Sequence, residues 1–285
     1  MELSALRIFK AVAEEGSVTL AAARLNRVQS NVSARLTQLE ESLGVPLFHR
    51  SGRKLQITVE GSRLLAYADR LLQLAEEAQA PMQPDQRPSG QLRIGSMETT
   101  AAARLPQVLA AFNRKHPHVD LILDTAPTDQ LLDGVLKHRL DVALVAGPVQ
   151  HAELEQLPVF EEELVLITCH GHAPVTSPQE LARRNLLVFR TGCTYRRRLE
   201  AWFAEGGVAP ARVSEFGTFE AIIGCVAAGM GVALMPKEVL NQRKLAKTIR
   251  QHTLPPHIAQ VETLLVWRKD VLNHPARSAF ADSLA

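Results

Sequence analysis

A short run of amide and hydroxyl side chains, followed by arginine, has the composition of a surface that reads nucleic acid. Amide, hydroxyl and guanidinium groups form hydrogen bonds with the edges of bases, while Lys and Arg neutralise phosphates. We therefore predict contacts with double-stranded DNA from one group of residues, namely Gln29, Ser30, Asn31, Ser33 and Arg35.

The charge of this region supports the same prediction. Between residues 24 and 54 six basic residues stand against the two acidic residues Glu40 and Glu41, and six minus two leaves +4. The whole chain carries only +2, from 32 Lys and Arg against 30 Asp and Glu, so its total charge says nothing about partners. The basic residues are Arg24, Arg27, Arg35, Arg50, Arg53 and Lys54.

Three predicted helices position the polar run. Leu6, Phe9, Val12 and Ala13 have the spacing of one buried helix face. A second helix covers residues 20–25 after Gly16-Ser17, and a third runs from Gln29 to Leu43 and buries Val32, Leu36 and Leu39. Two helices joined by about three residues predict a helix-turn-helix, although a plain three-helix bundle has the same pattern.

A charged hairpin is predicted next to these helices. Residues 49–54 lie between the apolar stretches 45–48 and 55–57, so we predict that they form the tip of a β-hairpin wing. The alternative for any single residue there is a solvated turn.

A longer helix begins after Thr58 and ends before a linker at residues 81–91, which holds three prolines. Its apolar residues repeat every four and three positions, which is the seam of a short coiled coil. We predict that this helix pairs two copies of the chain, because it leads away from any obvious core; packing onto the chain's own core is the alternative. The predicted dimerisation residues are Leu64, Leu65, Ala68, Leu71, Leu72 and Ala75.

Beyond the linker, β-branched runs alternate with helical stretches, which predicts an α/β fold with a mainly parallel sheet. The predicted strands cover residues 92–96, 119–125, 141–147, 163–169, 186–189, 232–235 and 264–267, and the predicted helices cover residues 101–114, 128–137, 196–205 and 219–228. Three segments rich in hydroxyl groups and glycine follow predicted strands and precede predicted helices. Such positions bind small polar or anionic ligands at helix N-termini, although each hydroxyl also suits an ordinary helix cap. The candidate ligand-binding residues are Ser96, Met97, Thr99, Thr100, Thr191, Gly192, Cys193, Thr194 and Thr218.

Several other classes of protein fit the sequence less well. It contains no phosphate loop, no nucleophile elbow and no zinc-binding helix, so we predict neither catalytic residues nor a metal or cofactor site. Three cysteines without a Cys-x-x-Cys pair predict a reducing, cytoplasmic setting, and the stretch 221–235 is shorter than a membrane span. Cys193 near a helix N-terminus raises the alternative of a redox sensor with a lowered thiol pKa.

Residues 1–80 resemble the N-terminal winged helix-turn-helix and linker helix of LysR-type transcriptional regulators, and three stretches beyond the linker resemble the effector domain of that family more loosely. In the second region these are residues 91–95, 140–144 and 228–236. The matching residues in the first region are Leu6, Phe9, Glu15-Gly16-Ser17, Ala21-Ala22, Leu25, Gln29-Ser30-Asn31-Val32-Ser33, Leu39-Glu40, Leu43-Gly44, Leu47-Phe48, Arg50, Thr58 and Gly61. Ser30, Val18 and Ala34 depart from the common family pattern, and Arg35 stands one position from the usual basic residue.

The resemblance implies a winged helix-turn-helix at 1–61, a dimerisation helix and hinge at 62–90, and an effector domain at 91–285. That domain is similar to periplasmic solute-binding proteins, with a cleft between subdomains at about 91–161 with 266–285 and at 162–265. It further implies a small-molecule effector, a dimer that forms a tetramer, promoter DNA as partner, and RNA polymerase if the protein activates. In the family the wing contacts the adjacent minor groove or backbone, which implies that role for Arg50 and Arg53. A solute-binding protein would leave the basic helices unexplained, and a sequence-neutral DNA binder would leave the second region unexplained.

Overall fold

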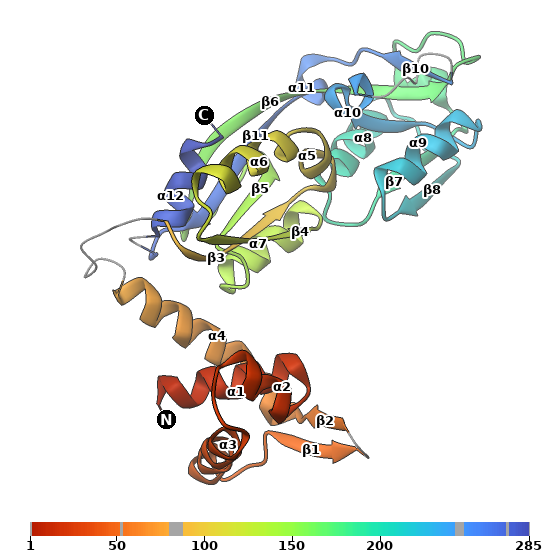
Figure 1. Ribbon diagram of the computed structural model, residues 1–285. Coiled ribbons are helices and arrows are strands. Elements are labelled where there is room, and N and C mark those ends of the chain that lie inside the picture. The colour runs from red at the N-terminus through yellow and green to blue at the C-terminus, as the bar shows by residue number, and fades with distance from the viewer. Residues whose placement is uncertain (1, 52–53, 80–87, 243–247, 272–273, 285) are drawn as a thin grey trace. The chain divides into compact units, whose positions relative to one another are not determined.

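The computed structural model describes residues 2–51, 54–79, 88–242, 248–271 and 274–284 (Figure 1). The chain divides into two compact units, Met1–Gln86 and Arg87–Ala285. The N-terminal unit contains α1 (Leu3–Glu15), α2 (Val18–Arg24), α3 (Gln29–Leu43), β1 (Phe48–Ser51), β2 (Lys54–Ile57) and α4 (Val59–Gln79).

The three predicted helices and the hairpin of this unit are confirmed. Gly16 and Gly44 end α1 and α3 in the left-handed conformation, at φ +60° and +71°, which a glycine adopts without steric cost. Ser17 begins α2 because its hydroxyl accepts a hydrogen bond from the Leu20 N–H. The predicted core residues Leu6, Phe9, Val12, Val32, Leu36 and Leu39 are buried, whereas Ala13, predicted on the same face as Leu6, is partly exposed.

The helix α4 packs against α1 of the same chain. We assigned its whole apolar seam to dimerisation because the helix leads away from any obvious core, and that reason was wrong. Ala68 and Leu72 are 0% and 6% exposed within the core of this unit, and Leu64 and Leu65 pack against it. An ion pair of 2.7 Å between Lys10 Nζ and Asp69 Oδ1 joins the two helices. The sequence gives no sign of this contact because α1 and α4 lie more than 40 residues apart.

The second unit is built on a seven-stranded sheet in the order β10–β6–β11–β5–β3–β4, with β9 paired to β6, and on a separate pair β7–β8. Its strands are β3 (Gly90–Ser96), β4 (Val119–Thr125), β5 (Val142–Ala146), β6 (Leu154–Cys169), β7 (Asn185–Phe189), β8 (Arg212–Phe216), β9 (Ala233–Pro236), β10 (Ile249–His252) and β11 (Gln260–Arg268). Its helices are α5 (Glu98–Ala103), α6 (Leu105–Lys115), α7 (Thr128–Leu136), α8 (Thr194–Glu205), α9 (Phe219–Ala227), α10 (Lys237–Asn241), α11 (Pro256–Ala259) and α12 (Pro275–Asp282), with a 3₁₀ turn at Pro178–Leu181.

The α/β architecture is confirmed, but the prediction of a mainly parallel sheet was wrong. β3 pairs in parallel with β4 and β5, and β7 with β8, as crossover helices require. β11, however, is antiparallel to both β5 and β6, and β6 is antiparallel to β9 and β10. Strand and helix alternation in a sequence does not reveal that the last strand returns to the middle of the sheet.

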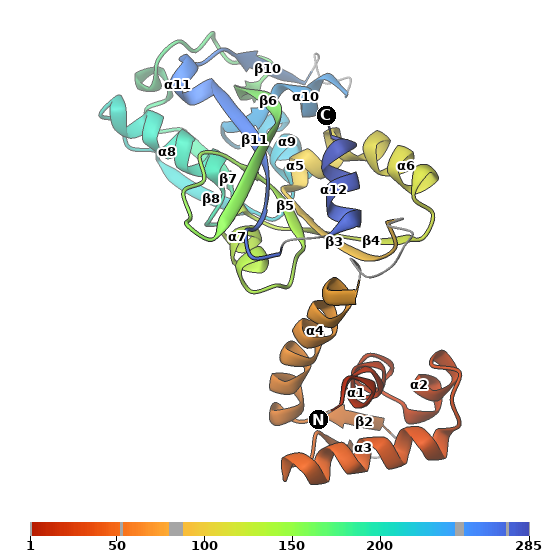
Figure 2. The same cartoon turned by 90° about the vertical axis from the view of Figure 1, so that its left-hand side faces the viewer.

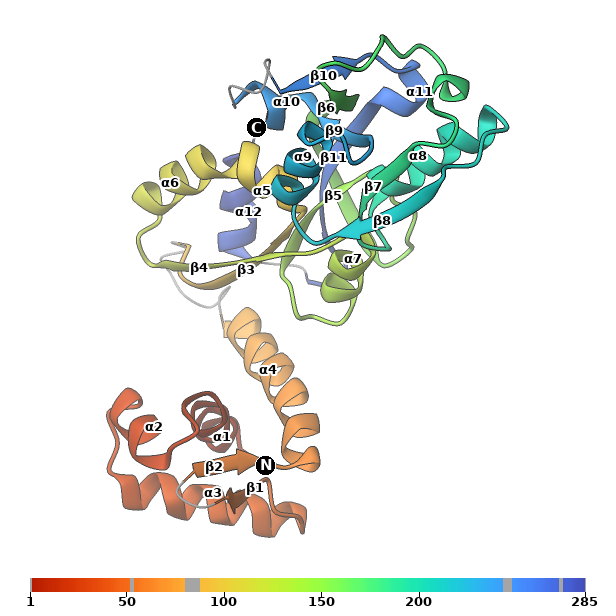
Figure 3. The same ribbon diagram turned by 90° about the vertical axis from the view of Figure 1, so that its right-hand side faces the viewer.

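The long strands β6 and β11 connect the two halves of this unit, and they run side by side in Figure 2. One hydrophobic core gathers around β3, α6 and α12, and another around the end of β6, α9 and β9. Figure 3 shows α12 beside β3, and α9 beside β7 and β8. The helix expected at 101–114 is two helices that meet at Arg104, because Pro106 lacks the N–H that would continue the first helix.

No helix in the described part of the chain combines the length and apolar character that a membrane span requires.

Candidate functional site

The first turns of α3 present polar side chains to solvent. Gln29, Ser30 and Asn31 are exposed and Ser33 is partly exposed. Val28 precedes the helix and offers no side-chain cap, so the first N–H groups of α3 keep their hydrogen-bonding capacity and partial positive charge. This end of α3 therefore combines base-reading side chains with donors that suit a phosphate.

The turn between α2 and α3 fixes how the two helices cross. Ala21 and Ala22 are buried and small, which allows the helices to approach closely. Asn26 occupies the left-handed conformation at φ +50°, which asparagine tolerates better than most residues. The Arg27 N–H then donates to the Ala22 carbonyl, so the chain reverses within three residues. The predicted helix-turn-helix is present.

The positive charge of this region is smaller than the count over residues 24–54 suggests. The Arg24 guanidinium lies 2.6 Å from a Glu14 carboxylate oxygen and 3.2 Å from one of Glu15. Arg35 donates to Glu2 at 3.3 Å, with its side chain 44% exposed. These acidic residues precede the counted stretch in the sequence, and only the fold brings them to the arginines.

The wing is confirmed as an antiparallel hairpin in which Phe48 pairs with Ile57 and Arg50 with Leu55. Arg53 lies outside the described residues. The hairpin is tied to α4 through Thr58, whose hydroxyl donates to the Pro46 carbonyl and accepts from the Gly61 N–H. Gly61 leaves no room for a side chain, because a Cβ there would lie 2.3 Å from the Leu47 carbonyl oxygen.

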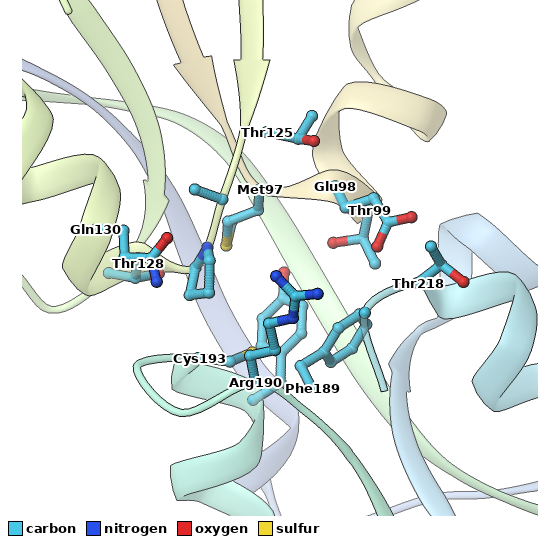
Figure 4. Close-up of a pocket in the computed structure, with 14 residues that line it drawn as sticks. Met97, Glu98, Thr99, Thr125, Thr128, Gln130, Phe189, Arg190, Cys193 and Thr218 are labelled. Atoms are coloured by element: carbon cyan, nitrogen blue, oxygen red, sulfur yellow. The ribbon is translucent and has the colours of Figure 1, made fainter. Parts of the chain in front are cut away.

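A cavity of about 190 Å³ lies in the second unit, and Figure 4 shows fourteen residues that line it. They come from the segments that follow β3, β4, β7 and β8. Each of those segments opens a helix, and the N-cap residues Met97, Pro127, Cys193 and Thr218 all line the cavity. The three segments predicted from the sequence thus meet at one cavity, and a fourth joins them.

Four of the nine predicted ligand-binding residues line this cavity, namely Met97, Thr99, Cys193 and Thr218. The other five are absent from its lining, and four of them have other contacts. The buried Ser96 hydroxyl donates to the Met97 carbonyl, Thr191 bonds to Glu215, and Gly192 faces Asp129. The Thr194 hydroxyl contacts Thr128 at 3.4 Å and accepts from Arg197. Thr100 is 2% exposed.

The sequence argument missed lining residues that its own rule could have found. Thr125 is the last residue of β4, a strand whose bounds were predicted correctly, and Ala126, Pro127, Thr128 and Gln130 follow it, so all five stand at the same kind of strand end. Tyr195 and Phe189 gave no signal, because a buried aromatic residue next to a strand has the pattern of ordinary core.

Two charged side chains line the cavity. Glu98 accepts a hydrogen bond from the Phe219 N–H at 3.2 Å, and burial, which is the largest cause, raises the pKa of its carboxyl. Arg190 is the other, and its guanidinium lies against Gly217, where a Cβ would come within 3.3 Å of Nη2. The glycine at position 217 therefore makes room for this guanidinium.

The thiol of Cys193 does not have the lowered pKa that a redox sensor requires. Burial raises its pKa and outweighs the N–H groups of Arg196 and Tyr195 and the nearby arginines, which act in the opposite direction. Cys169, Cys193 and Cys225 are all free thiols. Nor does the described part of the chain bring together three or more His, Cys, Asp or Glu residues in a way that would hold a metal ion.

Family models match both units of this chain. Residues 3–62 match the bacterial regulatory helix-turn-helix protein of the lysR family, and residues 85–285 match the LysR substrate binding domain. Among curated relatives, the HTH-type transcriptional regulator GltR of Bacillus subtilis (strain 168) is 44% identical over 98% of this chain and 95% of its own length.

Solved structures share the fold over the full chain. A full-length OxyR from Pseudomonas aeruginosa superimposes with a TM-score of 0.75 at 24% identity, covering 100% of this chain and 94% of that one. Full-length CbnR in complex with its target DNA gives 0.69 at 24% identity, covering 100% and 99%.

Proposed function

This chain belongs to the LysR family of transcriptional regulators, and from that premise we propose that a small molecule in the cavity described above controls its binding to promoter DNA. It is a regulator and not an enzyme, because the family and the relatives are transcriptional regulators. One observation carries the proposal. The same chain holds a helix-turn-helix with an exposed polar helix start and a separate cavity at which four helices begin.

We assign base reading to Gln29, Ser30 and Asn31, with Ser33 beside them, because these side chains project from the first turns of α3. Arg50 and Arg53 of the wing are assigned to the adjacent backbone or minor groove. Arg35 joins the contact only if it leaves Glu2, since the free protein holds it in that ion pair.

Self-association through α4 is part of the proposal, with a changed set of residues. Tyr67, Leu71 and Leu74 are 62%, 37% and 61% exposed, and their spacing of four and three residues makes an apolar seam on the outer face of α4. Ala68 and Leu72 are buried in the chain's own core, and Leu64 and Leu65 pack against that core. Leu71 is therefore the member of the predicted dimerisation set that this seam retains, with the partly exposed Ala75 next to Leu74.

The remaining assignments concern organisation and partners. The division into residues 1–61, 62–90 and 91–285, with two subdomains in the last, is proposed with a tetramer as the working assembly and RNA polymerase as partner of an activator. A ligand acts as a switch only by binding the two DNA-binding states with different affinities, so promoter DNA must in return change the affinity for the ligand.

The test is selection of a preferred sequence from a random DNA library by the full-length protein, followed by competition against a scrambled duplex of equal composition. Binding to the selected site should be at least a thousandfold tighter. Equal affinity for both duplexes would contradict the assignment of a sequence-specific site.

Variants localise the contact. Gln29→Ala should weaken binding to the selected site by about tenfold, whereas Gln38→Ala should leave it unchanged. Gln38 is an exposed glutamine of the same helix, nine residues further on and therefore half a turn away around its axis. Equal effects of the two substitutions would contradict the orientation proposed for α3.

A further inference from the structure

The two charged residues that line the cavity, Glu98 and Arg190, lack an oppositely charged partner among the described residues, unlike two arginines next to the cavity. Arg196 Nη1 lies 2.8 Å from Glu215, and Arg197 Nη1 lies 3.0 Å from Asp129, so these two neighbouring arginines each have an acidic partner. Glu98 and Arg190 make no ion pair with any residue that the structure describes, and they are the two charged residues among the fourteen that line the cavity.

Glu98 is a half-buried carboxylate that lacks a compensating cation. The Glu98 carboxylate accepts a hydrogen bond from the Phe219 N–H, and the nearby Glu220 adds negative charge. Desolvation penalises the ionised form of such a group, which is why its pKa is raised. A ligand that brings a positive charge to this carboxylate would remove that penalty.

The opposite side of the cavity suits a negative charge. Figure 4 shows Arg190 extending its guanidinium into the space between Met97, Thr99 and Phe189. The helices α7, α8 and α9 also begin at the cavity, and their N-termini carry partial positive charge.

A buried hydroxyl pair lies in the wall of the cavity. The Tyr195 side chain is 2% exposed, and its hydroxyl interacts with the Thr99 side chain, although not at ideal hydrogen-bond geometry. Burial, followed by the charge of Glu162, raises the pKa of the Tyr195 phenol, and the Thr99 side chain opposes the rise, so the hydroxyl keeps its proton. Tyr195 and Thr99 both line the cavity and therefore offer a hydroxyl donor to a ligand there.

We propose that the effector is a small zwitterion of the α-amino-acid class, with its ammonium group at Glu98 and its carboxylate at Arg190 and the Tyr195 hydroxyl. The proposal rests on the proposed function, in which this cavity is the effector site. A dicarboxylate would place a second negative charge near Glu98, and a diamine would place a positive charge near Arg190. The cavity of about 190 Å³ has room for a small metabolite.

The first experiment measures the melting temperature of the full-length protein with each of the twenty L-α-amino acids as probe. At least one should raise it, because a ligand that binds the folded state stabilises that state. For each such amino acid, the carboxylic acid without its amino group and the amine without its carboxylate should bind about tenfold to a hundredfold more weakly. The proposal is overturned if none of the twenty raises the melting temperature, or if either stripped analogue binds as tightly.

The second experiment uses Glu98→Gln and Arg190→Gln, with Glu155→Gln and Arg114→Gln as exposed controls of the same chemistry. Glu98→Gln should weaken amino-acid binding and remove the preference over the acid that lacks the amino group, while Arg190→Gln should remove the preference over the amine. If Glu98 instead served as a protonated donor to an anion, Glu98→Gln would preserve binding, and that result would overturn the proposal.

Failure of this inference differs from failure of the proposed function. If a fraction of cell extract changes the footprint on the selected DNA site while no amino acid binds, the regulator switch stands and the zwitterion is wrong. If neither extract nor amino acid changes the footprint, the switch itself is wrong.

Discussion

Arg104, the residue between α5 and α6, forms a bidentate ion pair with Glu162 of strand β6. The Arg104 Nε lies 2.9 Å from Oε1 of Glu162, and Nη2 lies 3.2 Å from Oε2. The Glu162 side chain is 4% exposed, and the same guanidinium lies 5.4 Å from the centre of the Phe160 ring. This pair fixes the end of α5, the helix that carries Glu98 and Thr99, onto β6.

Arg104→Gln should lower the free energy of unfolding by about 3 kcal/mol, because it leaves a buried carboxylate without its cation. The measurement is urea unfolding of the full-length protein at neutral pH. Arg139→Gln is the control, since Arg139 pairs with Asp133 on the surface with its own side chain 64% exposed, and the loss there should be below about 1 kcal/mol. Equal losses in the two variants would show that burial does not set the strength of the Arg104 pair.

Leu72→Ala and Leu74→Ala should act on different properties, because one side chain is 6% exposed against α1 and the other is 61% exposed. Leu72→Ala should destabilise the N-terminal unit by about 2–4 kcal/mol, measured by hydrogen exchange of α1 and α4. Leu74→Ala should leave that exchange nearly unchanged and instead raise the dimer dissociation constant in sedimentation. A dimer weakened by Leu72→Ala without faster exchange would reverse the assignment of the two faces.

Gly61→Ala and Gly224→Ala should have opposite signs although both glycines lie inside helices. A Cβ at position 61 would meet the Leu47 carbonyl oxygen at 2.3 Å and Ile57 Cγ1 at 2.7 Å, so the wing must shift at a cost of about 1–3 kcal/mol. A Cβ at position 224 meets nothing within 4 Å, and alanine there should stabilise the protein by about 0.5–1 kcal/mol. The measurement is the melting temperature of both variants, which should fall for Gly61→Ala and rise for Gly224→Ala. A stabilising alanine at position 61 would refute the close contact with Leu47.

His252 should make the protein less stable in mild acid. Its Nδ1 accepts from the Val175 N–H at 3.1 Å, so Nε2 carries the proton and donates to the Thr168 hydroxyl at 2.9 Å. Burial lowers the pKa of this histidine below 6.5, with smaller contributions in the same direction from His172 and Arg250, whereas Glu180 raises it. The unfolded chain therefore takes up a proton from about pH 6.5 downward, while the folded protein does so only at lower pH.

The expected result is a free energy of unfolding that falls as the pH drops below 6.5 and levels off below the lowered folded pKa. His252→Asn should flatten this slope while costing about 1 kcal/mol at neutral pH through the lost Thr168 contact. The exposed His118 provides the matched control, and His118→Asn should keep the slope. Part of the slope should remain in His252→Asn, because burial also lowers the pKa of His274. An unchanged slope in His252→Asn would contradict this role.

Local patterns in the sequence predicted the elements of the N-terminal unit closely. The bounds of α3 and its buried residues Val32, Leu36 and Leu39 follow from spacing and from the terminating Gly44. The same reasoning placed β4 at Val119–Thr125, predicted that the segments beginning at Ser96 and Arg190 stand at strand ends, and predicted that Gly217-Thr218 opens a helix. It missed β8 and β10, whose few exposed or alternating residues resemble loops.

What the sequence determined by itself is the set of elements and the residue types at their ends, because hydrophobic period, glycine stops and hydroxyl caps act over a few neighbouring residues. The tertiary structure decided which of those residues face a partner. Glu2 and Glu14 pair with Arg35 and Arg24, and Leu72 is buried in the core that contains α1. Cys193 lines the cavity, whereas the hydroxyl of the next residue, Thr194, bonds to Thr128 and Arg197. Each of these outcomes depends on contacts between segments far apart in the chain, and such contacts set burial, charge pairing and pKa.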